Sequence, residues 1–304
     1  MTTIGGAADS RGEPLAGAYA ALLLGALAMG ASPILVRLAE VGPFASAFWR
    51  VATALPLLWA WSQLEQRGDA KLARGVTKPV ALAGLFFTGD LVFWHLAIMN
   101  TTVANATFFA TTSPIWVVVF SVLLLRERVA GRTLLGLALA LAGGAALIGE
   151  SMSVDPARLA GDLYGVVTSV FFGAYFLAVS RARRSHGSGR LIFLSSLITA
   201  SALGAIAFAF EDRLLPASLS GAAALLALGI VSHAGGQGLL AVALGRLPAT
   251  FSSLVIFLEA IAAALLGWAV LGERLSAVQA LGGVVILLGI YVARPRAVPV
   301  EPHP

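Results

Sequence analysis

The chain contains no cysteine, and only 12% of its 304 residues are charged. The absence of cysteine excludes disulfide bonds, thiolate chemistry and metal sites built on sulfur. A soluble domain carries about 25% charged residues, so this chain has too few for a protein surrounded by water. Apolar residues make up 59% of the chain instead. The composition therefore predicts a protein that lies in a lipid bilayer.

Sequence motifs of several enzyme classes are also missing. The chain has no Gly-x-x-x-x-Gly-Lys-Ser/Thr phosphate loop, no His-Glu-x-x-His and no Gly-x-Ser-x-Gly. It has no acid pair at short spacing in the apolar segments and no metal-ligand spacing of histidines. We therefore expect no enzyme activity, no catalytic residue, no metal and no cofactor, and ATP is not the direct source of energy.

The net charge of +5 raises the question of nucleic-acid binding. We reject that reading, because the basic residues lie in short loops between apolar stretches, which is an orientation signal in membrane proteins. The first 14 residues lack the basic start, apolar run and cleavage site of a removable signal peptide.

Ten segments have the roughly 17 to 25 mostly apolar residues that a membrane helix needs. All should be α-helices, because an isolated strand would leave its backbone unpaired in lipid. The predicted spans are 16–37, 44–64, 77–98, 102–125, 132–149, 160–180, 190–210, 219–244, 248–271 and 276–293.

Lys and Arg are distributed unevenly between the two sides of a ten-span chain, with fifteen on one side and four on the other. The richer side is expected to be the cytoplasm, so both termini should be cytoplasmic. We expect short cytoplasmic tails at 1–15 and 295–304 of a multi-pass protein of the bacterial inner membrane.

The two halves of the chain resemble each other. The phrase Leu125-Arg126-Glu127-Arg128 returns 146 residues later as Leu271-Gly272-Glu273-Arg274. The first repeat is predicted at 16–150 and the second at 157–294. Five spans is an odd number, so the second repeat enters the membrane from the opposite side and the repeats are inverted, with Glu127-Arg128 cytoplasmic and Glu273-Arg274 facing outward. Such repeats occur in many secondary transporters. Further matching pairs are Gly89 with Gly235, Leu135 with Leu281, Gly136 with Gly282, Leu141 with Leu287 and Gly143 with Gly289.

These phrases resemble the EamA repeat of the drug/metabolite transporter superfamily, and so do Phe48-Trp49-Arg50 and Ser113-Pro114. The resemblance covers nearly the whole chain and is strongest to the aromatic amino-acid exporter branch, the YddG type. It implies a carrier that exports small metabolites from the bacterial cytoplasm. One departure is Ala260 after Glu259, where family members often have a proline that would bend the helix.

Ionisable residues inside the predicted spans are few, and such residues usually face a cavity or a partner. Asp90 and Trp94 share a helix face and could bind the amine and ring of an aromatic amino acid; Asp90 could equally make a structural hydrogen bond. Glu259 lies near mid-membrane and could bind an amine, carry a proton or stabilise a helix contact. Arg50 could extend to the membrane surface, pair with an acid or bind a substrate carboxylate.

Other polar and aromatic residues also suit a ring-bearing zwitterion. His95 and His233 could relay protons, although a single buried histidine is more often only hydrogen-bonded. Gln237 shares a helix face with His233, and Tyr175 shares one with Phe171; for the aromatic residues simple packing is the alternative. Pro33, Pro56 and Pro114 are expected to bend their spans. Gly235, Gly236 and Gly238 would allow close approach of a neighbour.

We therefore predict a secondary transporter that exports amino acids, most of all aromatic ones, by alternating access around a central cavity. Its partners are the small-molecule substrate and the lipid bilayer, and the expected unit is a monomer. The predicted substrate-binding residues are Asp90, Trp94, Phe171, Tyr175, His233, Gln237 and Glu259, and those for coupling or ion pairing are Arg50, His95 and Glu259. The alternatives are export of a nucleoside, a purine or a cationic drug, an intramembrane enzyme, or a channel, which lacks a visible charge ring or carbonyl filter here.

Overall fold

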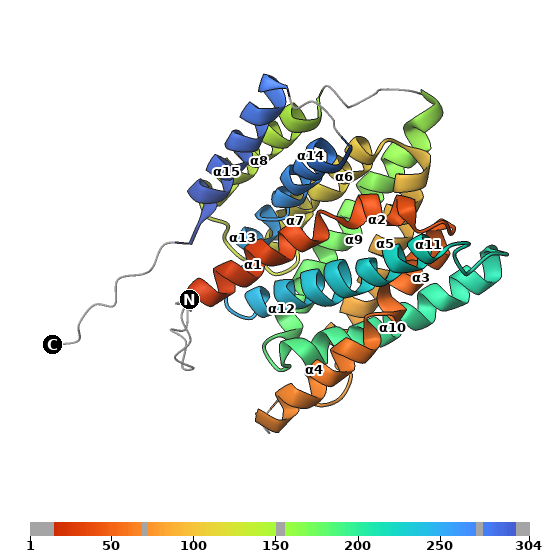
Figure 1. Ribbon diagram of the computed structural model, residues 1–304. Helices are drawn as coiled ribbons and strands as arrows, with labels where there is room; N and C mark the ends of the chain where they lie inside the picture. Colours follow the sequence, from red (N-terminus) through yellow and green to blue (C-terminus); the bar gives the residue numbers. More distant parts are fainter. Residues whose placement is uncertain (1–14, 69–71, 150–155, 272–275, 296–304) are drawn as a thin grey trace.

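The computed structural model describes residues 15–68, 72–149, 156–271 and 276–295, and every element assigned in these ranges is a helix (Figure 1). The prediction of an all-α membrane protein is confirmed. Five predicted spans are formed by one long helix each. These helices are α5 (Lys78–Asn100), α8 (Gly131–Ile148), α9 (Leu159–Ala182, preceded by the short 3-10 helix η1, Pro156–Arg158), α10 (Ser188–Phe210) and α15 (Ala277–Ala293).

Prolines break three spans where the sequence predicted a bend. The first span is divided into α1 (Leu15–Met29) and α2 (Ser32–Leu38), the second into α3 (Pro43–Ala52) and α4 (Leu55–Gly68), and the fourth into α6 (Val103–Thr111) and α7 (Ser113–Leu123). Pro33, Pro56 and Pro114 each lie at the second position of the following helix, where a missing backbone N–H costs nothing.

The two remaining spans are broken without a proline. The eighth consists of α11 (Leu219–Ala227), the π-helix η2 (Leu228–Gln237) and α12 (Gly238–Leu244). The ninth is divided at Val255 and Ile256 into α13 (Ala249–Leu254) and α14 (Phe257–Leu271). The kink that the missing proline left in question is present: the N–H groups of Ile256, Leu258 and Glu259 bond to carbonyls only three residues back, which makes a tight turn.

Eight helices within the described residues are long and apolar enough to cross a membrane, judged by length and composition. Ala277–Ala293, with 17 residues, is a shorter apolar helix. The pair α3 and α4 falls outside both groups and carries Arg50 and Glu65. Glu273 and Arg274, the second copy of the repeated phrase, lie outside the described residues.

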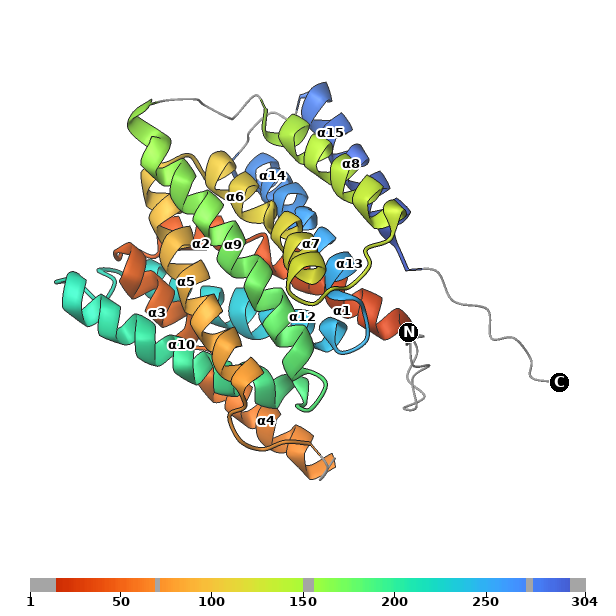
Figure 2. The same cartoon turned by 180° about the vertical axis from the view of Figure 1, so that it is seen from behind.

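Helices of the two halves pack against one another reciprocally (Figures 1 and 2). α8 lies along α15, and α10 lies along α3 and α4. A Cβ added to Gly136 would meet Gly289, and one added to Gly143 would meet Gly282, so α8 and its equivalent α15 run in opposite directions. Gly42 contacts Glu211 while Gly189 contacts Trp61, so the second and seventh spans are also antiparallel. Equivalent helices that run oppositely are what an inverted repeat requires.

The contacts between different spans follow the same pattern. α5 of the first half packs on α9 of the second, and η2 and α12 of the second half pack on α1 of the first. The third span therefore packs on the sixth as the eighth span, its equivalent in the second half, packs on the first. Gly236 contacts Met29 and Gly238 contacts Trp61, so the close approach expected of a neighbouring helix is confirmed at these two glycines. A Cβ on Gly235 would meet only the carbonyl of Ile230 in its own helix.

Charged residues at helix ends join the two halves in equivalent pairs that sequence reasoning missed. Glu211 accepts the backbone N–H groups of Phe44 and Ala45 at the start of α3, at 2.7 and 2.9 Å. Glu65, 146 residues earlier, accepts the N–H of Arg190 at the start of α10, at 3.0 Å. The common spacing of 146 was a signal available in the sequence.

Two arginines with the same spacing act at helix C-termini. Arg37 donates to the carbonyls of Ile98 and Thr101 at the end of α5. Arg183 donates to the carbonyl of Ala241 in α12, near the end of the eighth span. A carboxylate at a helix start and a guanidinium at a helix end each match the helix dipole.

Candidate functional site

Five of the residues predicted from the sequence line one small cavity in the interior: Arg50 from α3, Asp90 and Trp94 from α5, Gln237 from η2 and Glu259 from α14. The first three come from the first repeat and the last two from the second. The remaining lining residues are Met29, Ser32, Ala110 and Phe172.

Arg50 is the cation of this cavity. Its side chain is only 4% exposed, so it does not extend to the membrane surface, and that alternative is excluded. The guanidinium lies 5.4 Å from the ring centroid of Trp94, an arrangement worth about 2 kcal/mol when desolvated. Its charge also acts on the carboxylates of Asp90 and Glu259. One cation and two acids therefore share the cavity.

Glu259 reaches the cavity because of the break in the ninth span. It lies in the first turn of α14, where free backbone N–H groups and the helix dipole favour a carboxylate. Asp90 is not itself at a helix end, since it lies in the middle of the 23-residue α5.

Several polar atoms around the cavity have no hydrogen-bond partner within the described residues. They are Ser32 Oγ, Arg50 Nε, Gln237 Oε1 and Glu259 Oε1. Buried polar groups are nearly always hydrogen-bonded, and leaving one unpaired costs about 1–3 kcal/mol. Four such atoms around one cavity could all be paired by a bound polar ligand, so they indicate a binding site.

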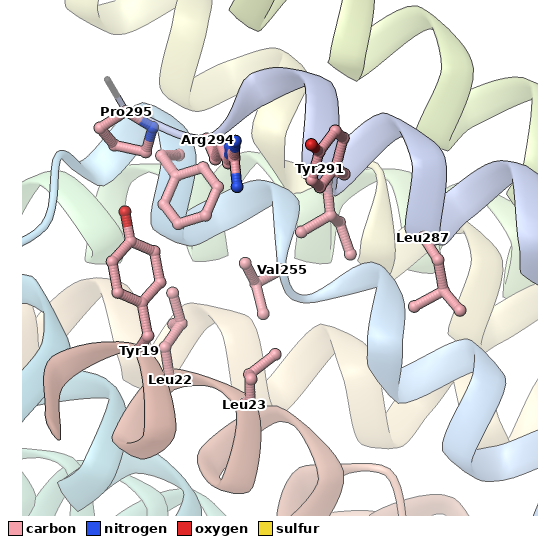
Figure 3. A pocket seen from close by; sticks show the side chains of 10 residues that line it. Tyr19, Leu22, Leu23, Val255, Leu287, Tyr291, Arg294 and Pro295 are labelled. Atoms are coloured by element: carbon pink, nitrogen blue, oxygen red, sulfur yellow. The ribbon is translucent and has the colours of Figure 1, made fainter. Parts of the chain in front are cut away.

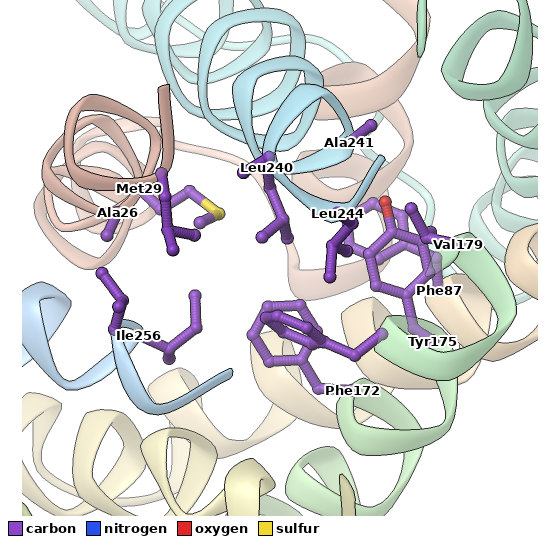
Figure 4. Close-up of a cluster of buried hydrophobic side chains, with 14 of the residues drawn as sticks. Ala26, Met29, Phe87, Phe172, Tyr175, Val179, Leu240, Ala241, Leu244 and Ile256 are labelled. Atoms are coloured by element: carbon purple, nitrogen blue, oxygen red, sulfur yellow. The ribbon is translucent and has the colours of Figure 1, made fainter. Parts of the chain in front are cut away.

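The cavity holds about 30 Å³, which is room for a water molecule and far less than an amino acid. Apolar layers close it on both sides. Toward the side of the chain termini, Met29, Phe87, Phe172, Tyr175 and Leu240 point toward one another from four spans (Figure 4). On the opposite side lies a second cluster that includes Val36, Ala106 and Leu228. The structure is therefore a closed state.

The aromatic residues of α9 are divided between different surroundings. Phe172, not Phe171, lines the cavity, and it stacks on Tyr175 with ring centroids 6.0 Å apart. Phe171 packs on Gly89 and stacks on Phe93 at 5.7 Å, away from the cavity. Tyr175 lies behind Phe172, against Phe87 at 4.7 Å.

The two histidines also lie outside the cavity lining. His233 Nε2 is 2.8 Å from Ser196 Oγ, and its ring packs on Phe87. His95 Nδ1 is 2.8 Å from the carbonyl of Leu91, and its ring contacts Trp94 edge-on. Both arrangements match the hydrogen-bonded alternative that the sequence left open, and His95 stands directly behind a cavity residue.

A polar cluster fastens the start of α6 to α9. Asp162 accepts hydrogen bonds from Thr101 at 2.7 Å and from the amide of Asn105 at 2.9 Å. A second, larger hollow lies elsewhere, between α1, α13 and α15 (Figure 3). It shares no lining residue with the central cavity.

Comparison with known proteins agrees with the repeat. The model of a family described as the EamA-like transporter family matches residues 16–149 and again 159–294. The chain is 28% identical over 237 residues to the pseudopaline exporter CntI of Pseudomonas aeruginosa, covering 78% of this chain and 81% of that one. It is 26% identical over 280 residues to an uncharacterized transporter of Archaeoglobus fulgidus, covering 85% and 90%. A solved crystal structure matches with a TM-score of 0.78 at 21% identity, over 92% of this chain and 98% of that one, which establishes a shared fold.

Proposed function

The chain belongs to the EamA-like transporter family, and we propose that it exports small metabolites carrying both an amine and a carboxylate, above all aromatic amino acids. One observation carries the proposal: a guanidinium, two carboxylates and aromatic rings from both inverted repeats surround one closed interior cavity. The aromatic preference is finer than the family assignment and rests on Trp94 and Phe172.

Each end of such a substrate has a complementary group in the cavity. Arg50 suits the carboxylate, since a guanidinium binds a carboxylate through two parallel hydrogen bonds. Asp90 or Glu259 suits the ammonium group, and Glu259 Oε1, which has no hydrogen-bond partner among the described residues, is an available acceptor. The ring would then lie against Trp94 and Phe172, on whose faces apolar and cation–π contacts are both favourable.

Transport requires that the cavity open to one side at a time. The closed state holds about 30 Å³, so a substrate enters only when one of the two apolar layers separates. Inverted repeats supply two equivalent ways to do this, because each repeat can adopt the conformation of the other. The breaks beside Arg50 and Glu259 place the charged residues next to points where helices can bend.

The test is transport by the purified protein in liposomes. Labelled tryptophan and phenylalanine should cross faster than in empty liposomes, and faster than in liposomes with the Glu259→Gln variant. Absence of flux above empty liposomes for every amino acid would refute the substrate class. Repeating the assay with and without a pH gradient separates proton coupling from facilitated diffusion.

A second candidate substrate comes from a relative. The protein from Pseudomonas aeruginosa is named as an exporter of pseudopaline, and the similarity spans 78% of this chain. Pseudopaline therefore belongs in the liposome panel, together with a nucleoside and a cationic drug. Flux of pseudopaline without flux of tryptophan would favour this candidate over the first.

A further inference from the structure

The hollow between α1, α13 and α15 has the shape of a groove of about 690 Å³ (Figure 3). Its walls are mostly apolar, and it follows α15 from Leu287 to Arg294, about 10 Å at the helical rise of 1.5 Å per residue. The lining residues are Tyr19, Leu22, Leu23, Phe251, Val255, Leu287, Ile290, Tyr291, Arg294 and Pro295.

The groove opens on the outer surface of the helix bundle. Leu23 is 43% exposed, Leu287 52% and Tyr291 59%, although all three line the groove. For a membrane-spanning chain this surface faces hydrocarbon. If the groove were empty, its walls would lack dispersion contacts. The acyl chains of the surrounding lipids can supply these contacts.

One end of the groove is polar. Tyr19 and Arg294 lie together at that end, with Leu287 at the other (Figure 3). The guanidinium of Arg294 stands 4.4 Å from the ring centroid of Tyr291, and within the described residues no carboxylate is paired with it. A guanidinium and a phenol hydroxyl at the same end of a groove suit a phosphate.

The repeat shows that this groove is not a necessary product of the fold. The two repeats are offset by 146 residues, so the position equivalent to Tyr19 is Gly165 and the position equivalent to Val255 is Phe109. There the space is filled, since a Cβ added to Gly165 would lie 2.8 Å from Phe109 Cβ. The contact of Gly165 in the second repeat with Phe109 in the first therefore closes the place that is equivalent to the groove.

We propose that the groove binds a phospholipid with an anionic headgroup from the leaflet in which both termini lie. One acyl chain lies along Leu23, Leu287 and Ile290, and the phosphate is held by Arg294 and Tyr19. Net negative charge matters because no carboxylate among the described residues is paired with the guanidinium, and a basic residue at the surface adds about 1 kcal/mol toward anionic lipid.

The test compares lipids on the full-length protein. Native mass spectrometry should show a lipid retained from nanodiscs, with phosphatidylglycerol preferred over phosphatidylcholine. Arg294→Gln should lower that preference about fivefold, the equivalent of about 1 kcal/mol. Arg181→Gln is the matched control, because Arg181 is exposed at the end of α9 and does not line the groove.

A second variant tests the acyl chain separately from the headgroup. Leu23→Trp should fill the groove and reduce retention of both lipids, while the exposed position of Leu23 leaves the fold intact. Equal retention of the two lipids by the wild type, or unchanged retention in both Arg294→Gln and Leu23→Trp, would overturn the proposal. Displacement of the retained lipid by tryptophan would mean that the groove is a substrate entrance instead.

Discussion

Glu65 and Glu211 stand 146 residues apart, and each binds the start of a helix in the other half of the molecule, Glu65 through one backbone N–H and Glu211 through two. Glu211 ends the seventh span and stabilises the start of the second, whereas Glu65 near the end of the second stabilises the start of the seventh. The two contacts lie at opposite ends of the same pair of spans.

Removing either carboxylate should therefore destabilise the fold to a similar degree. Glu211→Ala and Glu65→Ala are each expected to cost about 1 kcal/mol, the usual effect of losing a helix N-terminal cap. Thermal unfolding in detergent measures this, with Asp212→Ala as the exposed neighbouring control. The two losses should add in the double variant, because the sites do not touch. A control as damaging as Glu211→Ala would contradict the capping role.

Neutralising the acids of the cavity should reduce transport while leaving folding intact. Asp90→Asn and Glu259→Gln keep the size of each side chain but remove its charge for a substrate ammonium group. We expect the flux of tryptophan into liposomes to fall about tenfold or more, equivalent to about 1.4 kcal/mol. Folded yield serves as the internal check and Glu127→Gln as the exposed control. Normal transport by both cavity variants would remove these acids from the site.

Trp94 should affect aromatic substrates most. Trp94→Ala removes the ring beneath Arg50 and the proposed surface for the substrate ring, whereas Trp94→Phe keeps an aromatic face. Flux of phenylalanine should drop strongly in the first variant and partly recover in the second, and flux of alanine should change less than that of phenylalanine. An identical loss for alanine and phenylalanine would mean that Trp94 only positions Arg50.

Two adjacent glycines of α15 should respond oppositely to a methyl group. A Cβ on Gly282 would lie 2.5 Å from Leu147 N and 2.6 Å from the Gly143 carbonyl, so α8 and α15 would have to separate. Gly282→Ala should cost about 1–3 kcal/mol. An added Cβ on Gly283 would meet no atom of the described residues within 4 Å, so Gly283→Ala should leave stability unchanged or raise it by about 0.5–1 kcal/mol. Equal melting temperatures for the two variants would contradict this packing.

The absence of cysteine makes the orientation directly measurable. Asp212→Cys and Arg184→Cys each introduce one thiol at an exposed position. Because the chain has no cysteine of its own, that thiol is the one a maleimide labels. With cytoplasmic termini, a membrane-impermeant maleimide should label the Asp212→Cys variant on intact cells. It should label the Arg184→Cys variant only after permeabilisation. The reverse pattern would invert the proposed topology.

Much of this architecture could be predicted from local sequence. The long apolar segments predicted the helices, and Pro33, Pro56 and Pro114 predicted three of the breaks. A proline interrupts the hydrogen bonds of the helical turn in which it lies, so its effect is local. The break before Glu259 has no such local cause. It depends on i to i−3 hydrogen bonding at Ile256 and Leu258, which the sequence does not mark.

The residues of the site could be predicted from their types, but which side chains point into the cavity could be predicted less well. Arg50, Asp90 and Glu259 stand out because charge is rare in these segments. The choice between Phe171 and Phe172 depends on the rotation of α9, and neighbouring residues point about 100° apart on a helix of 3.6 residues per turn. Phe171 packs on Gly89, a long-range contact that the local sequence does not mark.

Each half of the chain supplies a carboxylate that binds a helix start in the other half, and this has a consequence for a protein with only one repeat. A chain containing a single repeat would carry both the capping acid and the helix start that needs it, yet too far apart to meet within one molecule. A second copy inserted upside down would satisfy both at once. Two oppositely inserted single repeats would therefore make between two molecules the contacts that this chain makes within one.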